Sequence, residues 1–409
     1  AIMLGALADG ITEIAGFLEG DDALATVSAF RAMGVRIDGP VDGEVTVHGV
    51  GLRGLTAPPQ ALDLGNSGTS IRLMSGLLAG QAFAAQLTGD ASLRGRPMGR
   101  VTAPLTLMGA QISANTDGTP PLSIEPVGGL RAIHYDLPVA SAQVKSCVLL
   151  AGLYADGETS ITEPAPTRDH TERMLRGFGY PVTVAGNRVS LVGGGRLQPT
   201  EIDVPADISS AAFFLVAASI APNSDLTLTH VGVNPTRTGV IQILRLMGAD
   251  IAVSNEREVG GEPVADLRVR YAPLRGIEIP GQLVPLAIDE FPALFIAAAC
   301  AQGRTVLRGA AELRVKESDR IAAMEVGLTT LGIATEVLDD GIVIDGGALG
   351  GGAINTHHDH RIAMSFAIAA LRAEAEIHVL DCDHVSTSFP GFDALARGLG
   401  LQISVHADE

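Results

Sequence analysis

Apolar positions along the chain predict helices and strands that alternate with a long repeat. Segments with helical spacing of apolar residues end at a glycine, and a short strand-like run follows each glycine. A glycine just after a helix takes the left-handed conformation at little cost, which makes it a common helix end. Successive glycines of this kind lie 68 to 84 residues apart, so the pattern predicts six similar units. These glycines are Gly34, Gly109, Gly179, Gly248, Gly332 and Gly400.

A second series of segments has the same period. Each unit contains one helix that is apolar nearly all round, and is therefore expected to be buried, beside an amphipathic helix. The predicted buried helices are Ala1–Ala8, Ile71–Ala79, Val144–Ala155, Ala211–Ala221, Phe291–Ala301 and Arg361–Leu371. Runs rich in Val, Ile and Thr predict strands at Glu44–Val50, Arg188–Val192, Leu226–Val231, Arg268–Tyr271 and Ile342–Asp345. The pattern fits two similar α/β domains of three units each, over residues 1–205 and 206–409.

Composition and charge limit the classes of partner. The net charge is −18, which disfavours nucleic acid and anionic membranes as partners. The longest apolar runs, Ala211–Ala221 and Phe291–Ala301, are too short to span a bilayer, and the start of the chain does not resemble a signal peptide. Cys147, Cys300 and Cys382 are odd in number and far apart, which favours a reducing compartment. We therefore expect a cytoplasmic protein without a membrane segment.

Basic residues stand at several predicted helix starts, where the helix dipole disfavours cations. Lys316 and Arg320 lie four residues apart at the mouth of a helix that ends near Gly332, and we expect them on one face. Further basic residues of this kind are Arg94, Arg96, Arg168 and Arg361. Because anions bind at helix N-termini, the pattern predicts a cleft between two domains for a multiply anionic small molecule. The alternative for Lys316 and Arg320 is a solvated salt-bridge cluster with Glu317 and Asp319.

Polar segments also precede the predicted buried helices. The Gly-rich turn Gly65–Ser70 offers backbone N–H groups to an anion but lacks the Gly-Lys-Ser/Thr of a nucleotide-binding loop, and an ordinary capped turn is the alternative. Ser141 is expected to cap its helix, whereas Gln143 in the first turn has no evident role in the core. Asp289 and Glu290 are acids at a helix start, which helix capping explains without catalysis.

The segment Thr356–Arg361 contains three histidines and an aspartate, a composition that can indicate a metal site. Adjacent histidines on one local segment rarely face the same ion, and no second His/Cys cluster completes a ligand set. We therefore expect no metal here.

Together these motifs resemble the 5-enolpyruvylshikimate-3-phosphate (EPSP) synthase family of enolpyruvyl transferases, over essentially the whole chain. The resemblance is carried by Leu64–Arg72, Arg94–Met98, Ser141–Gln143, Thr167–Thr171, Asn234–Gly239, Ile288–Glu290, Arg314–Arg320 and Asp359–Met364. It implies two inside-out α/β barrel domains, each of three βαβαββ units, with substrates between them. It also implies transfer of the enolpyruvyl group of phosphoenolpyruvate to the 5-hydroxyl of shikimate 3-phosphate, giving EPSP and phosphate. No metal or organic cofactor takes part in the family's reaction, and we expect a monomer.

The resemblance also assigns roles to individual residues. Shikimate 3-phosphate is expected to contact Ser141, Ala142, Gln143, Arg168, Asp289 and Lys316. Phosphoenolpyruvate is expected to contact Gly68, Arg96, Gln143, Arg320 and Arg361. Asp289 would act as the base near the 5-hydroxyl, Glu317 would donate a proton to the methylene carbon, and Lys316 would assist in catalysis.

Two departures from the family pattern change the expectations. A Lys-Ser-x-Ser-His/Asn-Arg segment that contacts both substrates is absent ahead of Ala1, so the first unit is incomplete and the N-terminal strand of the second domain is missing. We therefore expect little transferase activity from residues 1–409. Gly68 stands where glyphosate-tolerant relatives have alanine, which predicts inhibition by glyphosate although the Ser-Ala-Gln and Thr-Arg-Asp-His motifs resemble the tolerant subgroup.

Two other functions remain open. The sister enzyme, UDP-N-acetylglucosamine enolpyruvyl transferase, uses a cysteine on a mobile loop, whereas Cys147 and Cys300 lie in apolar helical segments. A protein that binds one ligand without turnover is the other alternative.

Overall fold

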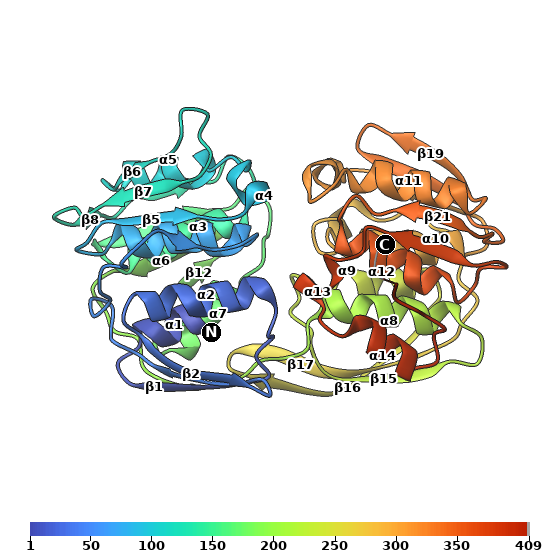
Figure 1. Ribbon diagram of the computed structural model, residues 1–409, viewed down its shortest axis with the longest axis horizontal. Coiled ribbons are helices and arrows are strands. Elements are labelled where there is room, and N and C mark those ends of the chain that lie inside the picture. The colour runs from blue at the N-terminus through green and yellow to red at the C-terminus, as the bar shows by residue number, and fades with distance from the viewer. Residues whose placement is uncertain (407–409) are drawn as a thin grey trace. The chain divides into compact units, whose positions relative to one another are not determined.

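The computed structural model describes residues 1–406 as two compact units (Figure 1). The first unit comprises Ala1–Val204 together with Val259–Glu262, and the second comprises Pro205–Glu258 and the described chain from Pro263 onward. Each unit has its own hydrophobic core, built mainly from aliphatic side chains.

The first unit repeats one arrangement three times. Each of its three four-stranded sheets has one parallel pair at an edge and antiparallel pairs elsewhere. In order, the sheets are β14 (Glu201–Asp203), β1 (Ile11–Ala15), β3 (Glu44–His48), β2 (Arg36–Val41); β4 (Leu62–Asp63), β5 (Ala85–Thr88), β7 (Leu122–Glu125), β6 (Gln111–Ser113); and β12 (Thr183–Ala185), β13 (Arg188–Val192), β11 (Glu158–Thr162), β9 (His134–Asp136). A two-stranded pair joins β10 (Ala155–Asp156) to β8 (Leu130–Arg131).

The helices of the first unit are of two kinds. The mostly buried helices are α1 (Ile2–Leu7), α3 (Gly68–Ala79) and α6 (Ala142–Gly152), and α3 packs directly on α6. The outer helices are α2 (Asp21–Ala32), α5 (Gly99–Leu107) and α7 (His170–Gly177), with a short α4 (Ala91–Arg94). Strand β14 comes from the end of this unit yet pairs with β1 near its start, which closes the repeat.

The second unit is built in the same way. Its buried helices α8 (Ile208–Ile220), α10 (Phe291–Ala299) and α12 (His360–Ala369) pack against one another. Its other helices are α9 (Gly239–Leu246), α11 (Arg320–Thr330), α13 (Val385–Ser388) and α14 (Phe392–Gly398), with 3-10 turns η1 (Gly281–Leu283) and η2 (Ala311–Val315). The sheets are β15 (Asp225–Gly232), β17 (Glu262–Arg270), β16 (Asp250–Val259); β18 (Arg304–Leu307), β20 (Gly341–Asp345), β19 (Ala334–Leu338); and β21 (Gly352–Asn355), β22 (Ile377–Leu380).

The periodic features predicted from the sequence are confirmed. All six predicted buried helices are present, with ends shifted by a few residues. The predicted strands correspond to β3, β13, β15, β17 and β20. The six repeated glycines all have positive φ, between 73° and 101°, and each follows the end of a helix. A β-carbon in this left-handed region is strained, which explains why glycine is used there.

One local prediction is wrong. Lys316 and Arg320 do not lie on one face of a helix, because α11 begins at Arg320 with Asp319 as its N-cap. Lys316 has an extended backbone and lies just after η2. A four-residue spacing brings side chains to one face only inside a helix, and here the capping aspartate sets a later start than the pattern predicts.

Candidate active site

The first group of candidate residues surrounds the N-termini of α3 and α6. Ser67 caps α3 and Ser141 caps α6, each accepting a hydrogen bond from a backbone N–H in the first turn. Because the two helices pack together, Gln143 in the first turn of α6 reaches across to α3, where its Nε2 donates to Thr69 Oγ1 at 3.0 Å. The cap predicted at Ser141 is confirmed, and the side chain of Gln143 now has a structural role.

Two arginines lie against Gly68, the first residue of α3. Arg72 Nη1 donates to the Gly68 carbonyl and to Gln143 Oε1, both at 3.0 Å. Arg96 donates to Asn66 Oδ1 at 2.5 Å. A β-carbon placed on Gly68 would lie 2.8 Å from Arg72 Nη1 and 2.9 Å from Arg96 Nη1. Burial, and next the positive charges of Arg96 and Arg100, lower the pKa of Arg72, as expected where arginines lie close together.

Two further candidates of the first unit are Ala142 and Arg168. Ala142 is the first residue of α6, so its backbone N–H belongs to the orphan set of that helix. Arg168 stands in the segment between β11 and α7, directly after Thr167, whose hydroxyl donates to Glu163. Of the candidates in the first unit, Gly68 and Gln143 both accept hydrogen bonds from Arg72, and Arg96 lies beside Gly68, so these three lie close together.

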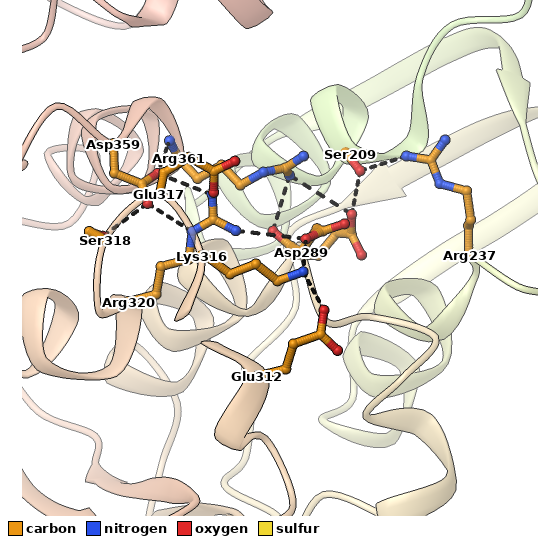
Figure 2. A network of polar contacts seen from close by, with 11 residues as sticks. Ser209, Arg237, Asp289, Glu312, Lys316, Glu317, Ser318, Arg320, Asp359 and Arg361 are labelled. Carbon is orange, nitrogen blue, oxygen red and sulfur yellow. Dashed lines mark hydrogen bonds and ion pairs between the residues drawn. The ribbon is translucent and has the colours of Figure 1, made fainter. Parts of the chain in front are cut away.

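The second group of candidates gathers at the N-termini of α10, α11 and α12 (Figure 2). Asp289 precedes α10, and its carboxylate Oδ1 lies 3.3 Å from Lys316 Nζ and 3.7 Å from Arg320 Nη1. Arg320 also donates to Glu317 Oε2 at 2.6 Å. Arg361, in the first turn of α12, donates to the backbone carbonyl of Asp289 at 3.0 Å. Every catalytic candidate is therefore in one polar network.

Arg320 is the centre of this network, and its side chain is only 1% exposed. Its Nε and Nη2 donate to Asp359 at 2.8 and 3.3 Å, and Asp359 also accepts from Ser318 Oγ at 3.0 Å and caps α12 through the Arg361 N–H. A buried guanidinium needs such partners, because an unpaired buried charge is very costly. The carboxylate of Asp289 lies between Lys316 and Arg320, and Arg320 also pairs with Glu317, as the salt-bridge alternative expects; binding of an anionic molecule at these cations stays a prediction.

Glu290 corrects a second prediction. It stands at the N-cap position of α10, but its side chain makes no capping hydrogen bond. Instead it accepts a hydrogen bond from Ser209 Oγ and lies 3.9 Å from Arg361 Nη1. Ser209 in turn accepts from Arg237 at 2.7 Å. Burial raises the pKa of Glu290, against the opposing effect of Arg361.

The network also shifts the titration of its own members. Burial is the largest single influence on Glu317 and would raise its pKa, but Arg320, a backbone hydrogen bond and His360 together outweigh it and lower the pKa. Burial, and next the charge of Arg361, lower the pKa of His360 to about 4. Glu317 is therefore a carboxylate at neutral pH, and His360 is a neutral imidazole.

The described part of the chain, residues 1–406, gives two negative results. No three His, Cys, Asp or Glu side chains in it lie close enough together to hold a metal ion. No helix in it combines the length and apolar character needed to cross a membrane.

Comparison with known proteins identifies the family. The sequence model of "EPSP synthase (3-phosphoshikimate 1-carboxyvinyltransferase)" matches residues 1–395. The chain belongs to the EPSP synthase family. It is 67% identical to the 3-phosphoshikimate 1-carboxyvinyltransferase of Alkalilimnicola ehrlichii, over 99% of this chain and 91% of the relative, and 66% identical to that of Methylococcus capsulatus, over 99% and 93%. The solved EPSP synthase of Acinetobacter baumannii superimposes with a TM-score of 0.92 at 60% identity, covering 98% of this chain and 92% of that one.

Family membership confirms the resemblance read from the motifs, together with the two-domain inside-out α/β fold class. It favours the main functional prediction over the UDP-N-acetylglucosamine alternative. The cysteines agree with this choice, because burial raises the pKa of Cys147 and of Cys300 to about 12, which leaves both as unreactive thiols.

Several residues of these EPSP synthase groups were not singled out from the sequence. Arg72 and Asp359 lie inside the family motifs Leu64–Arg72 and Asp359–Met364, which indicate that the two residues matter but not what they contact. Ser209 bonds to Glu290 from 81 residues away and Arg237 bonds to Ser209, and no local pattern indicates these contacts.

Proposed function

We propose that this chain transfers the enolpyruvyl group of phosphoenolpyruvate to the 5-hydroxyl of shikimate 3-phosphate, releasing phosphate and giving EPSP. The family to which it belongs bears the name of this transfer. The observation that carries the assignment of the chemistry is the convergence of Lys316 and Arg320 on Asp289, with Glu317 paired to the same arginine. Acids and bases held this closely can exchange protons with a bound substrate.

The reaction needs three proton movements, two in the addition step and one in the elimination step. The 5-hydroxyl loses a proton as its oxygen bonds to C2 of phosphoenolpyruvate, while C3 gains a proton and becomes a methyl group. The tetrahedral intermediate then expels phosphate, and the methyl carbon returns a proton. Asp289 is assigned as the base for the hydroxyl, with Lys316 beside it to stabilise charge, and Glu317 is assigned as the acid at C3.

Glu317 must gain a proton before it can act as an acid. Its ion pair with Arg320 lowers its pKa, so it does not carry that proton in the described state. A phosphoenolpyruvate oxygen that takes the Arg320 guanidinium would weaken this pair, and the pKa of Glu317 would then rise toward the value that its burial favours. Substrate binding thus prepares the acid.

The substrate contacts are assigned by type of group. Arginine forks match phosphate and carboxylate oxygens, and helix N-termini add backbone donors. We assign phosphoenolpyruvate to Gly68, Arg96, Gln143, Arg320 and Arg361. We assign shikimate 3-phosphate to Ser141, Ala142, Gln143, Arg168, Asp289 and Lys316.

The test is phosphate release from phosphoenolpyruvate, with shikimate 3-phosphate or UDP-N-acetylglucosamine as the acceptor. It is run on residues 1–409 and on a form carrying the family's Lys-Ser-x-Ser-His-Arg segment ahead of Ala1. We expect release with shikimate 3-phosphate and not with UDP-N-acetylglucosamine. Binding without turnover in both forms would favour the binding-only alternative, and release with the sugar nucleotide would favour the sister enzyme.

We assign the protein to the cytoplasm and expect it to be a monomer. The wide spacing of Cys147, Cys300 and Cys382 supports a reducing compartment, and Cys147 and Cys300 are free thiols. Light scattering after size-exclusion chromatography tests the monomer, for which a mass near 42.1 kDa is expected.

A further inference from the structure

The first unit contains a buried lysine to which the reaction assigns no role. Lys145 lies on α6, two residues after Gln143, and its side chain is 1% exposed. Its Nζ lies 3.1 Å from Glu163 Oε2 and 2.7 Å from Glu172 Oε1. Glu163 directly follows β11, and Glu172 is in the first turn of α7. One cation thus joins three elements that are separate in the chain.

Glu163 is the junction between this lysine and the segment that carries Arg168. One of its carboxylate oxygens accepts from Lys145, and the other accepts from the hydroxyl of Thr167. Its backbone is fixed as well, because its N–H and its carbonyl each form a 2.9 Å hydrogen bond with Asn187. Thr167 is therefore tied, through a rigidly held carboxylate, to α6.

A second link closes the same segment from the other side. Ser146, next to Lys145 on α6, exchanges a 2.7 Å hydrogen bond with Thr171 in the first turn of α7. Arg168 lies between the two anchored threonines, Thr167 and Thr171. Two polar links therefore connect the segment that carries Arg168 to α6, one on each side of the arginine.

The segment also borders a solvent-accessible pocket of about 250 Å³, lined among others by Lys145, Glu163, Pro166 and Thr167. On that side the segment is not covered by packed side chains, and the polar links join it to α6. Replacing buried ions with apolar groups is often neutral or stabilising, which makes fold stability a poor reason for this charge cluster.

We propose that the chain of contacts Lys145–Glu163–Thr167 positions Arg168 for the phosphate group of the acceptor substrate. Glu172 supplies the second negative charge next to Lys145, but it is not part of the chain of contacts that reaches Thr167. The three linked residues are positioning residues, since none of them is assigned to contact substrate. The inference rests on the proposed function, in which Arg168 binds shikimate 3-phosphate.

The decisive variant is Thr167→Val, which removes the hydroxyl and keeps the shape of the side chain. We expect the KM for shikimate 3-phosphate to rise about tenfold, the scale of one lost hydrogen bond to a charged group. The KM for phosphoenolpyruvate and kcat are expected to stay within about twofold, because a positioning defect at Arg168 affects one substrate only. Thr167→Ser restores the hydroxyl and should restore the KM.

Glu172→Gln is the matched control. It alters a carboxylate on the same lysine but leaves the Glu163–Thr167 contact in place, so the KM for shikimate 3-phosphate should change by less than about twofold. Titration calorimetry with shikimate 3-phosphate on the same variants measures the affinity without turnover.

Each outcome decides between the alternatives. A selective rise in KM and Kd for shikimate 3-phosphate in Thr167→Val, reversed in Thr167→Ser, supports the inference. Equal changes for both substrates, or a fall in melting temperature with unchanged KM, would show a purely structural role and overturn it. These assays use the form that carries the Lys-Ser-x-Ser-His-Arg segment ahead of Ala1. If this form, without further substitutions, releases no phosphate but binds shikimate 3-phosphate, the proposed function fails and the calorimetric comparison still decides the inference. Absence of both turnover and binding overturns both.

Discussion

The guanidinium of Arg320 is fixed by two hydrogen bonds to Asp359, from the first residue of α11 to the N-cap of α12. The distances are 2.8 and 3.3 Å, and the two side chains are 1% and 0% exposed. Charge-assisted bonds to a planar guanidinium fix its orientation as well as its position. Arg320, one of the arginines that we assign to phosphoenolpyruvate, is therefore held in a fixed orientation by Asp359, which has no assigned contact with substrate.

Removal of this carboxylate should be costly. Asp359→Ala leaves Arg320 with a buried, partly uncompensated charge and removes the cap of α12, so we expect a loss of about 3–5 kcal/mol in the free energy of unfolding. Urea denaturation followed by circular dichroism measures it. Asp345→Ala, which breaks a solvent-exposed pair with Arg304, is the control and should leave the stability nearly unchanged. Equal effects of the two changes would contradict the importance of the buried pair.

The stability of the second unit should depend on pH through His360. Its pKa is lowered from 6.5 to about 4 by burial and by Arg361. An unfolded chain therefore binds the proton more readily, so stability is full above pH 6.5 and falls as the pH is lowered toward 4. The effect of this one group is up to about 3 kcal/mol.

The measurement is the urea midpoint at several pH values between 7 and 4, for the unmodified chain and for His360→Gln. The difference between the two curves isolates the histidine, since the carboxylates of the network are common to both. We expect the variant to lose less stability on acidification. His378→Gln, at a histidine that is 62% exposed, is the control and should follow the unmodified curve. Parallel curves for His360→Gln would disprove the contribution of His360.

The acid–base assignments predict large losses of turnover. In the form that carries the Lys-Ser-x-Ser-His-Arg segment, Asp289→Ala and Glu317→Gln should each lower kcat by about a hundredfold or more, the usual scale for a lost acid or base. Glu312→Gln is the control, because Glu312, like Asp289, pairs with Lys316 (2.6 Å and 3.3 Å), but the side chain of Glu312 is 60% exposed. It should retain most of the activity. Near-normal kcat in Asp289→Ala or Glu317→Gln would remove that residue from the mechanism.

The sequence predicts those parts of this molecule that depend on local patterns. Gly248 ends its helix in a left-handed conformation, which glycine adopts at little cost. The run 211–221 is buried because it has no polar face. Both features repeat in every unit. Motif resemblance added residue roles that no periodicity contains.

The contacts between distant segments could not be predicted in this way. Asp289 and Lys316 meet because α10 and α11 begin at the same place in the second unit, which only the packed fold determines. Glu290 was expected to serve its own helix, but Ser209, on another helix, competes successfully for its carboxylate. The expectation that Lys316 and Arg320 share a helix face is wrong because α11 begins at Arg320, where the side chain of Asp319 caps the helix.

Glyphosate sensitivity should depend on Gly68. In this family the inhibitor occupies the phosphoenolpyruvate site, and tolerant relatives carry alanine at this position. The backbone of Gly68 accepts a β-carbon without left-handed strain, but the new methyl would lie 2.8 and 2.9 Å from the Nη1 atoms of Arg72 and Arg96. These arginine ends are flexible and can retreat, so the protein should fold while the space beside the α3 N-terminus shrinks.

We expect the enzyme with Gly68 to be inhibited competitively with phosphoenolpyruvate. Gly68→Ala should raise the glyphosate inhibition constant at least about tenfold more than it raises the KM for phosphoenolpyruvate, because the longer inhibitor needs the space that the methyl takes. Since Arg96 must move, some rise in the KM for phosphoenolpyruvate is expected too. Gly99→Ala, at a glycine whose added β-carbon has no neighbour within 4 Å, is the control and should change neither constant. If the enzyme with Gly68 already resists glyphosate as strongly as Gly68→Ala, the steric argument is wrong, and the placement of the arginines must determine tolerance instead.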